Sequence, residues 1–257
     1  MLRSKRSRAA LENDNPYELS FSDMMSGLLM VFILASMALV LQLINVQVDL
    51  KTEKEHLTKA ENVRGELLTE IQEELNKEGI DVHLSENSSV LRIPEKVINF
   101  KSASFRLPSG EENEFKIRRI AEVIDEKLSV GKRKDYIDTI FVEGHTDSQP
   151  YNDPRIKGNW GLSTFRAIQL WEFWGHCDGR ASNLQYLTNK DNKLMFSVSG
   201  YADTRPIACI EDDNRNEQTS CQEFYPLERK DEAYSKNRRI DIRFTVRKPK
   251  SEEFGEF

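Results

Sequence analysis

An uncharged segment near the beginning of the chain constrains its fold more than any other feature. Residues 24–44 contain no Asp, Glu, Lys or Arg, although charged residues make up 31% of the 257-residue sequence. A helix of 21 residues rises about 31 Å, close to the roughly 30 Å hydrocarbon thickness of a bilayer. The neighbouring sequence offers no apolar core large enough to bury such a helix. We therefore predict a transmembrane helix over residues 16–45, after a polar tail of residues 1–15.

A cleaved signal peptide is the alternative for this segment. Basic residues precede it, and Ser36-Met37-Ala38 resembles a small-residue cleavage site. The apolar run continues beyond that point to Ile44, so cleavage would leave an apolar new terminus. A retained signal anchor is therefore favoured. Lys and Arg are nearly balanced on the two sides of the segment, so the positive-inside rule alone gives no firm orientation.

Asp23 lies at the beginning of the apolar segment, and two interpretations of it are open. Ser20 and Asp23 match a capping box, in which Asp23 only stabilises the first turn of a helix. Alternatively, Asn15 caps a helix that begins at Pro16, with Glu18 at its third position. Asp23 then lies two turns into the helix, about 10 Å along its axis. An ionisable group within a membrane span usually marks an ion path or a partner, so Asp23 becomes a candidate ion carrier.

Residues 46–79 are charged but periodic and predict a helical stalk. Apolar residues recur at three-, four- and seven-residue spacings, which also fits a short parallel coiled coil. Arg64 falls in the apolar seam and weakens that pairing. The alternative is a single helix that covers another surface. The apolar positions are Leu50, Leu57, Leu67, Leu68, Ile71 and Leu75.

Residues 80–248 read as a separate α+β domain with a βαβαβ-like order, followed by a tail of residues 249–257. Strands are expected at residues 89–94, 138–144, 193–200 and 240–246, and helices at residues 112–128, 163–174 and up to about residue 238. Trp160, Trp171 and Trp174 recur at helical spacing, which favours the core over a binding surface.

Residues 208–230 read as an irregular insertion in this domain. Cys209 and Cys221 bracket its polar centre and could form a disulfide in an oxidising compartment. Three free thiols, with Cys177 as the third, are the alternative. Basic and acidic residues alternate along the whole chain, whose net charge is −6, and this pattern argues against nucleic acid as a partner.

Several motifs then follow in a fixed order. They are "INFKSASFRL" (residues 98–107), "GHTD" (144–147), "NWGLS" (159–163) with "RA" (166–167), "SGYADTRPI" (199–207) and "NRRIDIRF" (237–244). Across residues 89–247 the chain resembles the OmpA-like peptidoglycan-binding family and, within it, the MotB-type stator subunits. Phe21-Ser22-Asp23 before the apolar run extends this resemblance, because it is similar to the aromatic-x-Asp signature of these subunits.

The resemblance implies a site for the zwitterionic diamino acid of peptidoglycan stem peptides. Asp147 would bind its ammonium group and Arg166 its carboxylate, since an Arg fork suits a carboxylate. The other residues that the resemblance implies are Thr146, Asn159 and Leu162, which would shape the pocket, and Arg238 or Arg239, which would support it. An internal salt bridge between Asp147 and Arg166 is the alternative.

The resemblance also implies a membrane motor. A homodimer of this chain would lie inside a ring of a multi-span, MotA-like subunit, pass H⁺ (less favoured, Na⁺) by way of Asp23, and hold the complex to peptidoglycan. The chain would lie in the bacterial inner membrane, with a cytoplasmic N-terminus and a periplasmic C-terminal domain. The B subunit of the Zorya antiphage system (ZorB), with a ZorA-like ring, is favoured over a flagellar stator. A static tether without ion transport is the alternative of another class.

We expect no enzyme activity, cofactor or metal. His145 and Asp147 are two residues apart at a strand end, where side chains point alike rather than at each other. No nucleophile motif accompanies them, and His56, His83 and His176 lack metal-ligand spacing.

Overall fold

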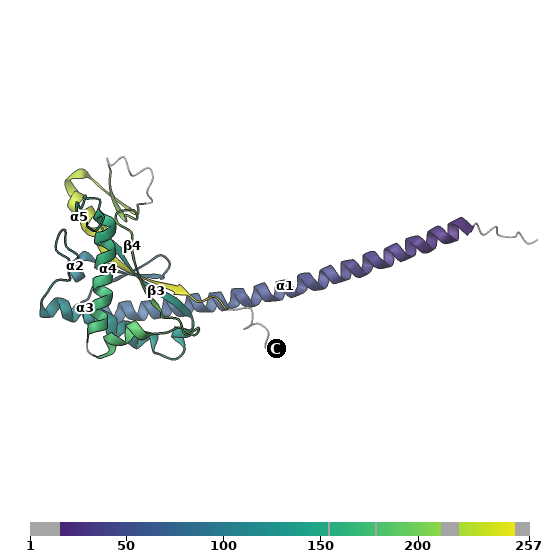
Figure 1. Ribbon diagram of the computed structural model, residues 1–257, viewed down its shortest axis with the longest axis horizontal. Helices are drawn as coiled ribbons and strands as arrows, with labels where there is room; N and C mark the ends of the chain where they lie inside the picture. The colour runs from purple at the N-terminus through teal and green to yellow at the C-terminus, as the bar shows by residue number, and fades with distance from the viewer. Residues whose placement is uncertain (1–15, 154, 178, 212–220, 250–257) are drawn as a thin grey trace, which may run out of the picture. The chain divides into compact units, whose positions relative to one another are not determined.

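The computed structural model describes residues 16–153, 155–177, 179–211 and 221–249 (Figure 1). The expected tail of residues 1–15, with the Asn15 cap, and the expected tail from residue 250 onward lie outside the described residues. The chain forms two compact units, residues 1–54 and residues 55–257.

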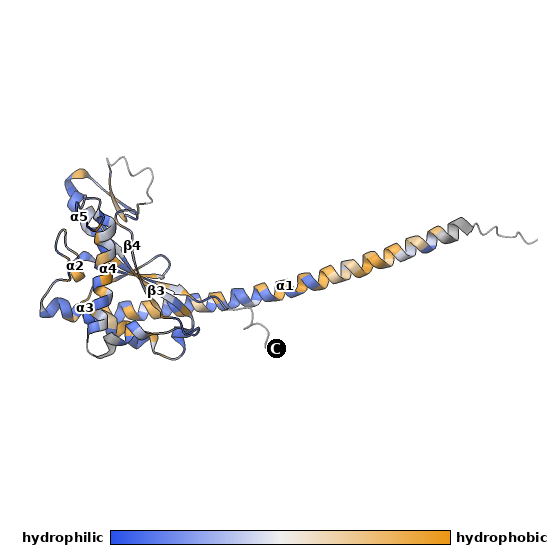
Figure 2. Cartoon of the chain, viewed as in Figure 1, coloured by the Kyte–Doolittle hydropathy of each residue, from blue (hydrophilic) through white to orange (hydrophobic). Residues whose placement is uncertain are grey.

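The first unit consists of the beginning of helix α1, which spans Pro16–Lys77. Because α1 begins at Pro16, Ser20 is not its N-cap, and Asp23 lies within the helix rather than in its first turn. In the part of the chain that the structure describes, α1 is the one helix long and apolar enough to cross a membrane. Its apolar segment appears as an almost continuous hydrophobic stretch in Figure 2.

The last turns of α1 belong to the second unit and enter its hydrophobic core. Two ion pairs join this region to the following helical segments: Glu78 Oε1, just after α1, lies 2.7 Å from Arg119 Nη2, and Glu70 Oε2 of α1 accepts a 2.9 Å hydrogen bond from Arg133 Nη1. This arrangement matches the alternative of a helix that covers another surface. The fully buried side chains of these turns are Leu67, Leu68, Ile71 and Leu75.

The second unit is built on a five-stranded sheet of order β1-β2-β7-β3-β4. The strands are β1 (His83–Ser85), β2 (Val90–Pro94), β3 (Ile137–His145), β4 (Phe196–Gly200) and β7 (Arg239–Val246). Strands β3 and β4 are parallel, and the other neighbouring strands are antiparallel. The connections contain α2 (Glu95–Ile98), α3 (Glu111–Leu128), α4 (Gly158–His176) and the 3-10 helices η1 (Arg133–Asp135) and η2 (Gly179–Tyr186). The mixed helix and sheet class expected from the sequence is confirmed.

Alternation along the central strand β7 separates the two faces of the sheet. Ile240, Ile242 and Phe244 are buried in the main hydrophobic core, whereas Arg239 and Asp241 alternate with them and face the other side. The core face packs against the helices, and the opposite face carries charged side chains.

Two glycines let α4 approach the sheet closely. A Cβ atom on Gly144 of β3 would lie 2.0 Å from the Ser163 carbonyl oxygen, and one on Gly200 of β4 would lie 2.2 Å from Thr164 Oγ1. Glycine at these positions therefore sets the depth at which the first turns of α4 sit against β3 and β4.

The tryptophans of α4 differ in burial although they share one side of the helix. Trp174 is fully buried and donates from Nε1 to the Ile117 carbonyl at 2.9 Å. Trp160 is 53% exposed, so its expected place in the core is wrong. Helical spacing predicts which side of a helix a residue is on, but it does not predict how far along the helix axis the core extends.

The insertion at residues 208–230 is more regular than expected. It contains a parallel pair of short strands, β5 (Ala208–Ile210) and β6 (Glu223–Tyr225), then η4 (Leu227–Arg229), and it ends at the start of α5 (Lys230–Asn237). A disulfide joins Cys209 to Cys221. The buried Asn237 holds β5 in place: its Oδ1 accepts from the backbone N–H of Ile207 and Ala208 at 2.9 and 3.0 Å.

Candidate functional site

The candidate site forms at one edge of the sheet because three neighbouring strands meet there. Arg239, the first residue of β7, is paired with Pro94 of β2 on one side and with His145 of β3 on the other. Strands β2 and β3 end at these two residues. Glu95, just after β2, and Asp147, two residues after β3, are therefore brought close to Arg238, which precedes β7.

The guanidinium of Arg238 lies between two carboxylates. Its Nη1 is 2.5 Å from Asp147 Oδ2, while Nε and Nη2 donate to Glu95 Oε1 and Oε2 at 2.5 and 2.8 Å. Burial lowers the pKa of Arg238, but the hydrogen bonds to Glu95 and Asp147 outweigh it and raise the pKa overall. One arginine therefore bridges two acids at the rim of the site.

Arg166 reaches the same edge from the third turn of α4. It is 3% exposed and donates from Nε to the Ser104 carbonyl at 2.9 Å and from Nη2 to the Lys101 carbonyl at 3.4 Å. Its guanidinium lies 5.0 Å from the centre of the Phe100 ring. Residues 98–107, matched only loosely in the sequence, thus supply the wall against which Arg166 packs.

Arg166 has no carboxylate partner within 4 Å among the described residues, and none of them accepts a hydrogen bond from its Nη1. Desolvation lowers the pKa of Arg166 to about 10, although the charges of Glu95 and Asp147 act in the opposite direction. The alternative of an internal salt bridge between Asp147 and Arg166 is wrong, because Asp147 pairs with Arg238. A buried guanidinium without a paired anion is costly, so its Nη1 suits an anionic group from outside the chain.

The loop that follows β3 is held by short-range hydrogen bonds. Asp147 Oδ1 accepts from the Gln149 backbone N–H at 3.0 Å, and Asn159 Nδ2 donates to the Asp147 and Gln149 carbonyls at 3.3 and 3.0 Å. Asn159 therefore fixes the loop that carries Asp147. Thr146 is buried, and its Oγ1 has no hydrogen-bond partner in the described chain; Leu162 is buried in the first turns of α4.

A cavity of about 10 Å³ is shared by Glu95, Arg166, Arg238 and Arg239, with Phe100 among its other lining residues. Glu95 was missed in the sequence, although it stands directly after a predicted strand. The space holds about one water molecule at most. Any larger group must displace a side chain in order to enter.

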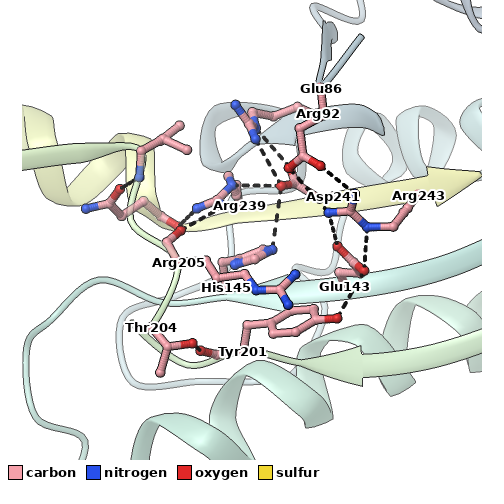
Figure 3. Close-up of polar contacts among 12 residues, drawn as sticks. Glu86, Arg92, Glu143, His145, Tyr201, Thr204, Arg205, Arg239, Asp241 and Arg243 are labelled. Carbon is pink, nitrogen blue, oxygen red and sulfur yellow. Dashed lines mark hydrogen bonds and ion pairs between the residues drawn. The ribbon is translucent and has the colours of Figure 1, made fainter. Parts of the chain in front are cut away.

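Arg239 lines this cavity, but its guanidinium belongs to a buried charge network on the far face of the sheet (Figure 3). Its Nε lies 3.0 Å from Asp241 Oδ2, and Asp241 Oδ1 accepts from Arg92 Nε at 3.0 Å. Burial alone would raise the pKa of Asp241, but Arg239 and Arg92 lower it overall. Of the two arginines expected to support the site, Arg238 contacts Asp147 and Arg239 does not.

His145 belongs to the same network and not to a dyad with Asp147. Its Nε2 lies 3.5 Å from Asp241 Oδ2, and its ring stacks on Tyr201 with centroids 5.4 Å apart. Desolvation, followed by the charge of Arg239, lowers the pKa of His145 to about 3. The imidazole is therefore neutral at neutral pH, and neither of its ring nitrogens has a hydrogen-bond partner among the described residues.

In the first unit, Asp23 follows Pro16 by seven residues on one continuous helix. Three residues further along, the Ser26 hydroxyl donates to the Ser22 carbonyl at 2.8 Å, so this polar group is satisfied within the helix. Asp23 and Ser26 are exposed on the helix surface, next to large apolar side chains such as Met24 and Met30.

Comparison with known proteins gives the following relatives. No protein-family model matches the chain. A Bacillus subtilis (strain 168) protein, described as uncharacterized protein YtxE, is 37% identical over 70 residues, which are 26% of this chain and 24% of that protein. The match thus spans about a quarter of the length of the curated relative.

The structural neighbours include MotB-like proteins and a cell wall anchor. A putative MotB-like protein from Desulfovibrio vulgaris has a TM-score of 0.46 and 16% identity, over 76% of this chain and 99% of that one. The cell wall anchor of the T6SS from Pseudomonas aeruginosa has a TM-score of 0.43 and 21% identity, over 70% and 97%. The periplasmic domain of Helicobacter pylori MotB (residues 90-256) has a TM-score of 0.38 and 25% identity, over 61% and 73%.

Proposed function

We propose that the second unit binds peptidoglycan by gripping the zwitterionic end of a stem-peptide diamino acid. The observation that carries this proposal is the environment of the Arg166 guanidinium, which is buried. Among the described residues, none accepts a hydrogen bond from its Nη1, and none places a carboxylate within 4 Å of it. A carboxylate that enters the site supplies the missing anion and accepts a charge-assisted hydrogen bond.

The other site residues bind the ammonium end of the ligand or shape the site. Asp147 accepts the ammonium group of the diamino acid; without ligand, its Oδ2 lies 2.5 Å from Arg238 Nη1. Thr146 offers an unused buried hydroxyl, Asn159 holds the loop, and Leu162 contributes a buried apolar side chain in the first turns of α4. A zwitterion brings no net charge, so each of its ends is compensated by an opposite charge that is already in place.

The first unit, in this proposal, carries ions across the bacterial inner membrane on Asp23. The start of α1 at Pro16 supports it, because it places the carboxylate of Asp23 two turns inside the helix, and an ionisable group within a span usually marks an ion path or a partner. Each charge that crosses contributes about 2.3 kcal/mol per 100 mV. A homodimer inside a ring of a multi-span, MotA-like subunit would use this energy for rotation while the periplasmic unit holds the wall.

The proposal also includes the biological system to which this motor belongs. We assign it to Zorya antiphage defence, with H⁺ as the ion, on the strength of the insertion at residues 208–230 and its disulfide. Replacement of Asp23 by Asn separates this assignment from its two alternatives, a flagellar stator and a static tether.

Peptidoglycan binding is tested by cosedimentation of the detergent-purified full chain with purified sacculi. Arg166→Ala removes the guanidinium that would bind the ligand carboxylate. We therefore expect the affinity for sacculi to fall at least about tenfold, which corresponds to a loss of ~1.4 kcal/mol in binding free energy. Arg229→Ala is the matched control, because Arg229 is exposed and its contacts are local, with Glu232 and the ring of Tyr225. Equal sedimentation of the wild type and the Arg166 variant would refute the proposal.

A further inference from the structure

The contacts of Arg238 suggest a role beyond support of the site. We propose that the guanidinium of Arg238 competes with the ligand for Asp147, because it occupies the position next to Asp147 that the ammonium group of the ligand would take. Glu95 is then a positioning residue: it keeps Arg238 paired after the ligand has displaced Arg238 from Asp147. This inference rests on the proposed binding of a stem-peptide zwitterion.

The geometry shows which of the two contacts gives way. Glu95 holds Arg238 through two hydrogen bonds, at 2.5 and 2.8 Å, whereas Asp147 holds it through one, at 2.5 Å. Bidentate contacts between Arg and a carboxylate are the stronger and more directional kind. An incoming ammonium therefore takes Asp147, and Arg238 stays on Glu95.

The exposure of the side chains is consistent with such an exchange. Glu95, Arg166 and Arg238 line a cavity of about 10 Å³, whereas Asp147 lies outside its lining and contacts Arg238 on the other side. Arg238 is the most exposed of the side chains involved, at 25% against 18% for Glu95 and 9% for Asp147. Its backbone lies between α5 and β7, so its side chain can turn toward solvent without breaking a strand pairing.

Charge explains why Glu95 is needed. Without it, Arg238 would have Asp147 as its only acid within hydrogen-bond distance among the described residues, and the ligand would compete against the full strength of that pair. Glu95 offers a second acid and is itself fixed by a 3.1 Å hydrogen bond from Ser235 Oγ. It therefore lowers the cost of releasing Asp147 while leaving no charge unpaired.

The test uses the full chain in detergent and a purified muropeptide with a free diamino-acid ammonium, titrated by calorimetry. Glu95→Gln is expected to weaken binding about tenfold, because Arg238 then competes more strongly for Asp147. Arg238→Gln in the Glu95→Gln background is expected to restore at least wild-type affinity, because the competitor is gone. The Glu95 effect should vanish for a muropeptide whose diamino-acid amine is acetylated, and a merely structural role of Glu95 would not depend on that amine.

Two outcomes overturn the inference. If Glu95→Gln binds as tightly as the wild type, Glu95 does not position Arg238. If the double variant binds more weakly than Glu95→Gln alone, Arg238 is a direct ligand-binding group and not a competitor. The proposed function fails separately, when the wild type binds no muropeptide or Arg166→Ala binds like the wild type. Thermal unfolding of each variant establishes that it is folded.

Discussion

Asp147 pairs with Arg238, not with Arg166: Asp147 Oδ2 lies 2.5 Å from Arg238 Nη1. The pairing follows from the register of β3 and β7, which places the residues beyond His145 next to those before Arg239. It leaves Arg166, on α4, facing the site without a carboxylate within 4 Å among the described residues. In the proposed function, this arrangement separates the group that binds the carboxylate, Arg166, from the group that binds the ammonium, Asp147.

The close packing of α4 on β3 should be sensitive to a single methyl group. We expect Gly144→Ala to destabilise the second unit by at least about 1–3 kcal/mol, because the new Cβ would lie 2.0 Å from the Ser163 carbonyl oxygen. Thermal unfolding followed by circular dichroism measures the change. Gly65→Ala is the control: its Cβ meets nothing within 4 Å, and alanine should stabilise α1 by about 0.5–1 kcal/mol. A Gly144 variant with wild-type stability would contradict this account of the packing.

Folding stability should fall as the pH drops below about 6.5, because the folded pKa of His145 is lowered to about 3. Below pH 6.5 the unfolded chain binds a proton at this histidine and the folded chain does not. The unfolding free energy therefore decreases as the pH falls from about 6.5 toward 3. Between pH 7.5 and 5, this single group should remove about 2 kcal/mol of unfolding free energy. Urea unfolding at pH 7.5 and 5, followed by tryptophan fluorescence, measures it.

His145→Gln provides the comparison for that measurement. Gln does not titrate, so the loss between pH 7.5 and 5 should shrink by about 2 kcal/mol, whatever the stability of the variant at pH 7.5. An unchanged pH dependence would mean that His145 is not the group responsible.

Asn237 should couple the insertion to the rest of the second unit. Its side chain accepts from two backbone N–H groups of β5 and its entry, and Nδ2 donates to the Ala208 carbonyl at 2.7 Å. Asn237→Ala leaves these buried groups unsatisfied, and we expect a loss of about 2–4 kcal/mol in chemical denaturation. Asn62→Ala, on the exposed surface of α1, should be nearly neutral. A small effect at Asn237 would show that the insertion is held mainly by other contacts.

Asp23→Asn should insert normally and abolish the phenotype that depends on ion flow. Cells with the native gene neighbourhood are scored for phage resistance and for swimming, and membrane levels are compared by blot. Loss of phage resistance supports the Zorya assignment, and loss of swimming supports a flagellar stator. Asp49→Asn, on the same helix beyond the uncharged segment, should keep both phenotypes. Survival of both in the Asp23 variant would make the protein a static tether.

Much of the fold could be predicted from the sequence because its signals are local. Proline at the start of α1, the alternation of β7 and the apolar periodicity of α3 each depend on a few neighbouring residues. Burial depends on distant partners, and there prediction failed. Trp160 and Trp174 share one side of α4, yet only Trp174 is in the core.

The site was predictable in part for the same reason. Motifs placed Asp147 and Arg166 near one sheet edge, but the partner of Asp147 depends on strand register. Glu95 is 52 residues from Asp147 in sequence and meets it only through Arg238. No local pattern distinguishes Arg238 from Arg239, because their roles differ only by the face of the sheet that each side chain reaches.

The most direct test of the central claim is calorimetric titration of the full chain with two muropeptides that differ in one group, the free or amidated carboxylate of the diamino acid. If Arg166 binds that carboxylate, amidation should weaken binding to the wild type at least about tenfold and should not affect Arg166→Ala. Equal binding of both muropeptides to the wild type would contradict the account.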